Sequence, residues 1–232
     1  MIEVFDCEQG SPDWWACRLG IPTVSEYGTV MAKGKDGKKD GTTSKTRMAY
    51  MRRLVGERIT GEAVEGYMNA DMERGKAMED EARATYALRN LDYNLQRVGF
   101  VRNGETGGSP DSLIEDVGGL EIKTAIPHIQ IDRLERNVLP PEHKPQVQGS
   151  LWVTEREWWD FVSYWPKLPL LVVRVYRDED YIREIEREVD QFLDELHALE
   201  FRIRQLDGSA SVMGALKASV DAGGHPLPAV MP

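Results

Sequence analysis

The segment Gly107–Ala125, GGSPDSLIEDVGGLEIKTA, has the pattern of a β-hairpin that carries charged residues on one face. Asp111 follows a turn and begins the first strand, and Gly118–Gly119 is expected to reverse the chain. Because residues two apart in a strand share a face, Glu121 and Lys123 of the return strand point the same way. The pattern therefore predicts two acidic groups and one basic group close together.

This arrangement suits metal-dependent chemistry on a phosphate. Two converging carboxylates repel each other unless a cation lies between them. Mg²⁺ takes oxygen ligands and keeps several waters, so Asp111, Glu121 and a backbone carbonyl are a sufficient set. Lys123 is suited to orient or deprotonate a water and to offset phosphate charge. The alternative is an exposed hairpin whose Glu–Lys pair contributes only ~0–1 kcal/mol.

Short apolar segments and helical patterns surround the hairpin and predict an α/β fold with a mixed central sheet flanked by helices. Strands are predicted at Arg97–Arg102, Ser112–Glu115, Leu120–Ala125, Trp159–Trp165 and Leu170–Tyr176. Helices are predicted at Thr43–Ile59, Asn69–Leu91, Glu142–Thr154 and Asp178–Leu206. A further helix is expected to begin at Glu26, with Ser25 as its cap.

Helical spacing also predicts which side chains of two helices face inward. In the second helix these are Met72, Ala77, Met78, Ala82, Tyr86 and Leu88. In the last helix they are Ile182, Ile185, Val189, Leu193, Leu196 and Leu199. Residues 1–207 are expected to form one domain, and the Gly-, Ala- and Pro-rich residues 208–232 a flexible tail.

Composition and charge restrict the classes of protein that the chain can belong to. The net charge of −10 is unevenly distributed: Thr29–Arg58 has nine basic against three acidic residues, and Tyr176–Asp207 has five against eleven. Such an asymmetry suits a protein that holds a polyanion at one place and repels it elsewhere, but it equally suits two solvated faces. No segment is apolar enough to span a membrane, and the N-terminus has no secretory pattern. Cys7 and Cys17, without metal-binding spacing, suit a reducing compartment such as the cytoplasm.

The hairpin and four other segments resemble the phage alkaline exonucleases, the lambda-exonuclease or YqaJ-type viral recombinase branch of the PD-(D/E)xK nucleases. The core of the resemblance is Pro110–Asp111 with Glu121–Ile122–Lys123. The remaining matches, in chain order, are Trp15-x-x-Arg18-x-Gly20 with Thr23 and Ser25, Gly75-x-x-x-Glu79-x-x-Ala82, Gln146-Val147-Gln148 and the strand Trp159–Tyr164. Val24 replaces the usual Ala, and His143 stands where relatives often carry Tyr.

The resemblance implies a restriction-endonuclease-like core and an active site with two Mg²⁺ ions, for which Mn²⁺ can substitute. It implies that Asp111, Glu121 and the Ile122 carbonyl bind one ion, and that Glu79 joins Asp111 at the second. Lys123 and Gln148 would position the attacking water. The implied pocket for a 5′-terminal phosphate consists of Arg18, Ser25 and Ser109, and Met72 corresponds to a wedge that separates the strands. Lys33, Lys35, Lys38 and Lys39 would contact the DNA backbone.

Each of these residues has a structural alternative when considered alone. Glu79 and Gln148 would be helix surface residues, and Met72 a core methionine. Ser25 would be a helix cap, Ser109 a turn residue, Arg18 one half of an ion pair, and the lysines a solubilising run.

The activity that the resemblance implies is 5′-to-3′ digestion of one strand of linear double-stranded DNA from a 5′-phosphorylated end. This leaves a 3′ single strand for recombination by annealing. The implied assembly is a homotrimeric ring around DNA, with a single-strand annealing protein as partner and the bacterial cytoplasm as location. Two alternatives remain, another PD-(D/E)xK nuclease such as an endonuclease, and a non-catalytic DNA-binding or scaffold protein built on the acidic helix Asp178–Leu206.

Overall fold

A five-stranded mixed sheet forms the centre of the molecule, in the order β2-β5-β6-β7-β8. The computed structural model describes residues 1–34, 44–63 and 70–222, with side chains described throughout except at 70–77 and 207–222. Strands β6 and β7 are parallel, and the other pairs are antiparallel. The strands are β2 (Leu95–Gln96), β5 (Ser112–Ile114), β6 (Gly118–Thr124), β7 (Trp158–Tyr164) and β8 (Leu171–Tyr176).

A second, three-stranded antiparallel sheet lies at the N-terminus, in the order β1-β3-β4. Its strands are β1 (Ile2–Phe5), β3 (Phe100–Asn103) and β4 (Thr106–Gly108). An isolated bridge between Thr23 and Gly107 joins the loop after the first helix to β4. This small sheet therefore ties the N-terminal segment to the strand that leads into the hairpin.

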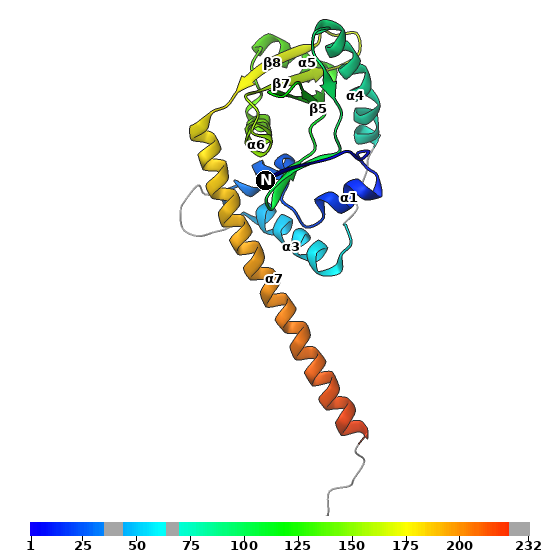
Figure 1. The fold of residues 1–232 in the computed structure, drawn as a ribbon, viewed down its shortest axis with the longest axis vertical. Coiled ribbons are helices and arrows are strands. Elements are labelled where there is room, and N and C mark those ends of the chain that lie inside the picture. Colours follow the sequence, from blue (N-terminus) through cyan, green and yellow to red (C-terminus); the bar gives the residue numbers. More distant parts are fainter. Residues whose placement is uncertain (35–43, 64–69, 223–232) are drawn as a thin grey trace, which may run out of the picture.

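Helices cover both faces of the larger sheet (Figure 1). They are α1 (Pro12–Arg18), α2 (Tyr27–Val30), α3 (Lys45–Thr60), α4 (Ala70–Arg89), α5 (Pro127–Arg136), α6 (Lys144–Thr154) and α7 (Glu179–Ala222), with short 3₁₀ turns η1 (Val24–Glu26) and η2 (Pro141–His143). The far half of α7 projects away from the body (Figure 1). None of the helices that the structure describes is long and apolar enough to cross a membrane.

Side chains along β6 and β7 point alternately to the two faces of the sheet, and each face packs in its own apolar core. Leu120 and Ile122 face α4, where they pack in one cluster with Ala82 and Tyr86. The other face packs in a second cluster against α6, α3 and α7. The described members of that cluster include Met51, Leu54, Val147, Leu151, Trp159, Phe161, Ile185, Val189 and Leu196. Glu121 and Lys123 therefore emerge on the α6 side of the sheet.

The mixed α/β fold predicted from the sequence is confirmed, and most elements lie within a few residues of their predicted bounds. The inward positions Ala82 and Tyr86 are fully buried, but Leu88 was predicted wrongly because it is 74% exposed near the end of α4. Ser25 does not cap a helix: it lies inside η1, whose N-cap is Thr23. The last helix does not end near Gly208 but continues to Ala222.

The expected turn at Gly118–Gly119 was also wrong, for a reason that concerns packing. The chain reverses at residues 115–117, where Glu115 has a φ of +47°, and both glycines lie within β6. Tryptophan rings of β7 lie directly over them: a Cβ on Gly118 would stand 2.3 Å from the Trp158 ring, and one on Gly119 2.1 Å from the Trp159 ring. These positions thus need glycine for space and not for a turn.

This packing predicts opposite effects for two glycine-to-alanine changes. Gly119→Ala should lower the free energy of unfolding by about 1–3 kcal/mol, because the Trp159 ring must move within a filled core. Gly56→Ala, in α3, should raise it by about 0.5–1 kcal/mol, because the new Cβ meets no atom within 4 Å beyond its chain neighbours and the adjacent helix backbone, and alanine favours the helix. Urea denaturation of both variants checks this, and equal effects would contradict the packing argument.

Candidate active site

Strand β6 holds an acidic and a basic side chain side by side beneath α6. Glu121 is buried, and the Lys123 Nζ lies 2.6 Å from its Oε1. From the first turn of α6, the Gln146 side-chain amide donates to the same oxygen at 2.6 Å. The carboxylate of Glu121 is therefore fixed from two sides, by its own strand and by the helix above it.

Asp111 lies beside this group, just before β5. Its backbone N–H donates to the Leu120 carbonyl at 3.2 Å, and its Oδ2 accepts from the Ile122 N–H at 2.5 Å. Burial raises the pKa of Asp111 well above its usual value, and repulsion from Glu121 and Glu79 raises it further. The Ile122 N–H and Lys123 oppose this rise. The carboxylate thus lies where added positive charge would stabilise its ionised form.

Helix α4 brings the third carboxylate to the same place through an arginine. The Arg83 guanidinium donates to Glu79 and to the Asp111 carbonyl, and at 2.8 Å to the Ser112 hydroxyl. Glu79 is close enough to Asp111 to raise the pKa of that group. Arg83 therefore joins α4 to the start of β5 and places Glu79 at the edge of the site.

Lys123 keeps its charge in this setting. Burial by itself would lower the pKa of Lys123, but Glu121, Asp111 and Glu79 outweigh it, so that the pKa lies above its usual value. An ammonium group at this position can donate hydrogen bonds to a water or to a phosphate oxygen.

The donor set has the chemistry of a site for a hard divalent cation. Among the described residues, no group of three or more His, Cys, Asp or Glu side chains is arranged to hold a metal ion. In this arrangement, Arg83 is paired with Glu79 and Lys123 with Glu121. The residues fit the ion nevertheless: burial and then repulsion from the neighbouring carboxylates raise the pKa of Asp111, and a cation among these oxygen donors would stabilise its ionised form.

The two glutamines of α6 have different environments. Gln148, for which the resemblance implied contact with the attacking water, makes its hydrogen bonds to β8 and α7 and not to the carboxylates. Gln148 is buried; its amide donates to the Tyr176 carbonyl and its oxygen accepts from the Asp178 N–H, both at 2.9 Å. It thus joins the end of β8 to the start of α7. Gln146, two residues earlier, contacts Glu121 instead.

Two of the three residues expected around a terminal phosphate contact one indole ring, and the third lies in the turn η1. The Arg18 guanidinium lies 4.1 Å from the centre of the Trp14 ring, whose Nε1 donates to the Ser109 hydroxyl at 2.8 Å. Burial lowers the pKa of Arg18. Ser25 is exposed, with its hydroxyl 3.2 Å from that of Thr23. Trp14 thus links Arg18 to Ser109, while Ser25 lies in η1, on the other side of the Gly20 turn from Arg18.

Several expected DNA contacts fall largely outside the described part of the chain. Lys33 is exposed on the surface. Lys35, Lys38 and Lys39 lie outside the described residues, as does the side chain of Met72.

His143, noted in the sequence only as a departure from the family pattern, lies close to the site. Its ring stacks on Phe161 with centroids 5.0 Å apart, and its Nε2 is 3.0 Å from the Arg133 Nη2. Because a guanidinium has only donors, this nitrogen accepts and the other carries the proton. Burial, then the charges of Lys123 and Arg133, lower the pKa of His143 to about 4. No spacing in the sequence indicates that this ring lies beside β7.

Comparison with known proteins identifies what the chain is similar to. The model of the YqaJ-like viral recombinase domain matches residues 13–157. Two structures of the alkaline exonuclease LHK-Exo from Laribacter hongkongensis, one of them in complex with dAMP, are 33% identical to the chain with a TM-score of 0.76. The match covers 86% of this chain and all of that one.

A phage-related exonuclease from Haemophilus somnus 129PT shares the fold at 15% identity and a TM-score of 0.59, covering 79% of this chain and 96% of its own. No curated protein matches the chain.

The surroundings of His143 predict an unusual titration. Its imidazole should take up a proton near pH 4, below the ordinary value of 6.5, and the pKa should rise in Lys123→Met because one nearby positive charge is removed. The unfolded chain then binds this proton first, so the contribution of His143 to stability is lost as the pH falls from about 6.5 to about 4. NMR of the imidazole resonances measures both values, and a midpoint near 6.5 would contradict the assignment.

Proposed function

Because the chain belongs to the YqaJ-like viral recombinase family, we propose that it is a metal-dependent exonuclease acting on double-stranded DNA. The observation that carries the proposal is the convergence of Asp111, Glu121 and Lys123 at one end of β6. A hydrolase acting on a phosphodiester needs a cation site, a positioned water and positive charge for the developing phosphate. Asp111 and Glu121 provide the cation site, and Lys123 provides the positive charge and a donor to the water.

Mg²⁺ is the ion that this donor set suits best, with Mn²⁺ as a substitute. Asp111, Glu121 and the Ile122 carbonyl would hold one ion, and Glu79 with Asp111 a second. Bound ions supply Lewis-acid activation of water and stabilise the leaving oxygen in sites of this kind. The contact of Glu79 with Arg83 uses one carboxylate oxygen, so the other oxygen would be available to the ion.

The remaining residues of the site would orient the reacting groups and neutralise the charge on the phosphate. The acidic neighbours of Lys123 raise its pKa and so keep its ammonium group protonated. This group would donate to the attacking water and offset charge on the phosphate. We assign to Gln146 the role that the resemblance implied for Gln148, because it is the Gln146 amide that reaches Glu121. Its contact holds that carboxylate in one orientation.

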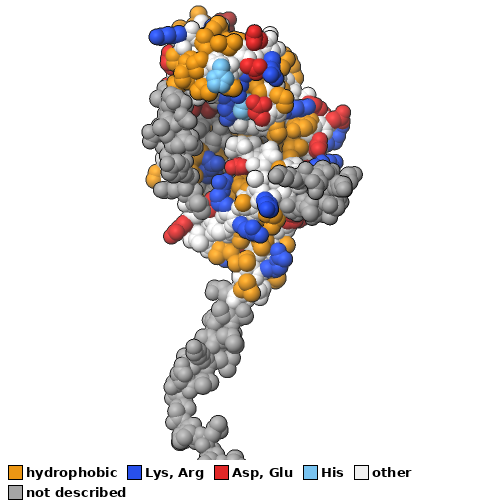
Figure 2. Space-filling view, turned by 180° about the vertical axis from the view of Figure 1, so that it is seen from behind, with side chains coloured by type: hydrophobic (Ala, Val, Ile, Leu, Met, Phe, Trp, Pro, Cys, Tyr) orange, Lys and Arg blue, Asp and Glu red, His pale blue; other side chains and the backbone are white. Residues whose placement is uncertain are grey.

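We further propose that digestion runs from a 5′-phosphorylated end and leaves a 3′ single strand. Arg18, Ser25 and Ser109 would bind the terminal phosphate, since an arginine and two hydroxyls match its oxygens. The half-buried Arg18 has no ion pair among the described residues, which leaves its charge for a ligand. Figure 2 shows basic side chains running down the middle of one face of the body, beside a hollow. A homotrimeric ring around DNA and an annealing protein as partner complete the proposal.

The substrate and metal requirements can be tested together. With Mg²⁺, wild-type protein should degrade linear duplex DNA with 5′ phosphates, leave closed circular DNA intact and lose activity in EDTA. Lys123→Met should reduce the rate at least about a hundredfold, because the group that orients water is lost while the stem remains. Degradation is followed by release of acid-soluble nucleotides, with end-labelled strands reporting direction.

The matched control is Lys167→Met, which removes an exposed ammonium from the β7–β8 loop and should leave the rate unchanged. Cleavage of closed circles would favour an endonuclease. A lack of any metal-dependent cleavage by the wild-type protein would favour a binding or scaffold protein.

The two glutamines of α6 provide a second test. Gln146→Ala should lower the exonuclease rate about tenfold or more with little change in stability, because Glu121 loses a partner. Gln148→Ala should instead reduce the free energy of unfolding by about 1–3 kcal/mol, because the Tyr176 carbonyl and the Asp178 N–H lose theirs. Single-turnover rates and urea denaturation separate the effects, and a rate loss confined to Gln148→Ala would reverse the assignment.

A further inference from the structure

The turn at Gly20 connects the two parts of the proposed phosphate pocket. Arg18 ends α1 on one side of it, and Ser25 lies in η1 on the other. Gly20 has a φ of +65°, a left-handed conformation, and a Cβ there would stand 2.4 Å from Cγ of Arg58. The turn is therefore restricted both by its backbone conformation and by a side chain of α3.

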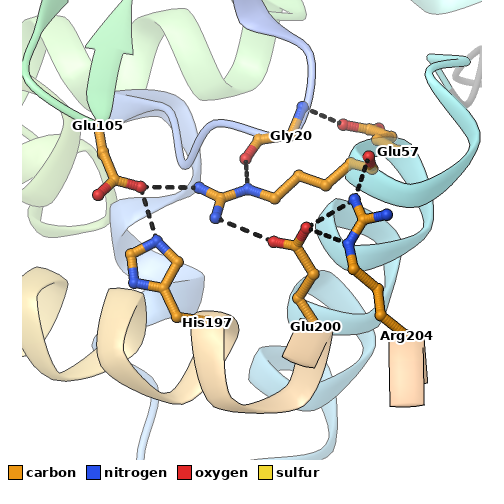
Figure 3. Close-up of polar contacts among 7 residues, drawn as sticks. Gly20, Glu57, Glu105, His197, Glu200 and Arg204 are labelled. Atoms are coloured by element: carbon orange, nitrogen blue, oxygen red, sulfur yellow. Dashed lines mark hydrogen bonds and ion pairs between the residues drawn. The ribbon is translucent and has the colours of Figure 1, made fainter. Parts of the chain in front are cut away.

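Adjacent side chains of α3 bind both backbone groups of Gly20 (Figure 3). Its N–H donates to the Glu57 Oε2 at 3.0 Å, and its carbonyl accepts from the Arg58 Nε at 2.7 Å. The Glu57 side chain is 10% exposed and that of Arg58 16% exposed, so both contacts lie largely out of water. The peptide groups before and after Gly20 are each held in this way, so the φ and ψ angles of Gly20 have little freedom to change.

Arg58 is itself held by two other parts of the chain (Figure 3). Its guanidinium pairs with Glu105, between β3 and β4, at 3.2 Å and with Glu200 of α7 at 3.5 Å. Glu105 is in turn 2.7 Å from the His197 Nε2, and Arg204 donates to the Arg58 carbonyl at 3.1 Å. The donor to Gly20 is thus fixed by groups far from it in sequence.

Other contacts of the same loop lead to the same helix and to the small sheet. The Thr23 N–H donates to the Tyr50 hydroxyl of α3 at 3.0 Å. The Pro22 carbonyl accepts from the Thr106 hydroxyl at 2.8 Å. Helix α3 therefore holds the loop at two points, of which the Gly20 contacts are nearer to Arg18.

We propose that Arg58 is a positioning residue for recognition of the 5′ end, because it fixes the Gly20 turn and thereby the relative placement of Arg18 and Ser25. This inference rests on the proposed function of the pocket. Arg58 does not touch the DNA; its hydrogen bond to the Gly20 carbonyl sets the geometry of groups that do. Since misplacement of a binding group by about 1 Å is costly, loss of this one bond should weaken selection of a terminal phosphate.

Two variants of Arg58 separate the hydrogen bond from the charge. In Arg58→Gln, the side-chain amide nitrogen occupies the same place along the chain as Nε, so a donor to Gly20 remains while the pairs with Glu105 and Glu200 are lost. Arg58→Met keeps the length but has no donor. The matched control is Arg52→Met, which removes an exposed arginine from the same helix.

The measurement is kcat/KM on duplexes with a 5′ phosphate divided by that on duplexes with a 5′ hydroxyl, with thermal unfolding to check each fold. Arg58→Met should lower this ratio about tenfold, through KM for the phosphorylated end, with kcat little changed. Arg58→Gln and Arg52→Met should stay within about threefold of wild type.

Other outcomes distinguish the premise from the inference. A wild-type ratio near one would overturn the proposed end recognition and this inference with it. A wild-type preference that Arg58→Met retains would overturn the inference alone. So would equal losses on both kinds of end, because they would indicate a purely structural role for Arg58.

Discussion

Repulsion between Asp111 and Glu121 is the constraint on which the arrangement of the site depends. Both carboxylates are held near each other by β6, one through the Ile122 N–H and the other by its place in the strand. Burial raises the pKa of Asp111, and repulsion from Glu121 raises it further. Two elements supply compensation: β6 contributes Lys123, and α4 contributes Arg83, which donates to the Asp111 carbonyl and pairs with Glu79.

On the opposite face of the sheet, a second buried charge, the carboxylate of Asp160, holds neighbouring elements together. Asp160 of β7 accepts from the Arg174 guanidinium at 2.8 Å with both oxygens and from the Tyr86 hydroxyl at 2.5 Å. Because the Asp160 carboxylate is paired and hydrogen-bonded, its burial is tolerated, whereas removal of one partner would leave an uncompensated charge. The cluster ties β7, β8 and α4 together below the strand that carries Glu121.

The sequence was sufficient for what depends on local periodicity and insufficient for what depends on contacts across the fold. Alternation along residues 120–123 predicted which side chains share a face, and the observed cores agree. Residues two apart in a helix point in different directions, so Gln146 and Gln148 could not both reach the site. Nothing local shows which of them does. Likewise Gly118–Gly119 has the composition of a turn, and only the tryptophans some forty residues later explain its place in a strand.

The charge distribution along the sequence differs from the distribution of unpaired charge in the folded structure. The basic stretch within Thr29–Arg58 and the acidic helix α7 suggested separate faces, yet the structure pairs them: Arg47 binds Glu195 with two hydrogen bonds, and Arg58 contacts Glu200. Part of the basic charge of α3 and part of the acidic charge of α7 are thus neutralised in ion pairs between the two helices. A net charge of −10 is therefore a weak argument against a polyanionic ligand. What matters is which cations have no internal ion pair, and Arg18, stacked on Trp14, has none among the described residues.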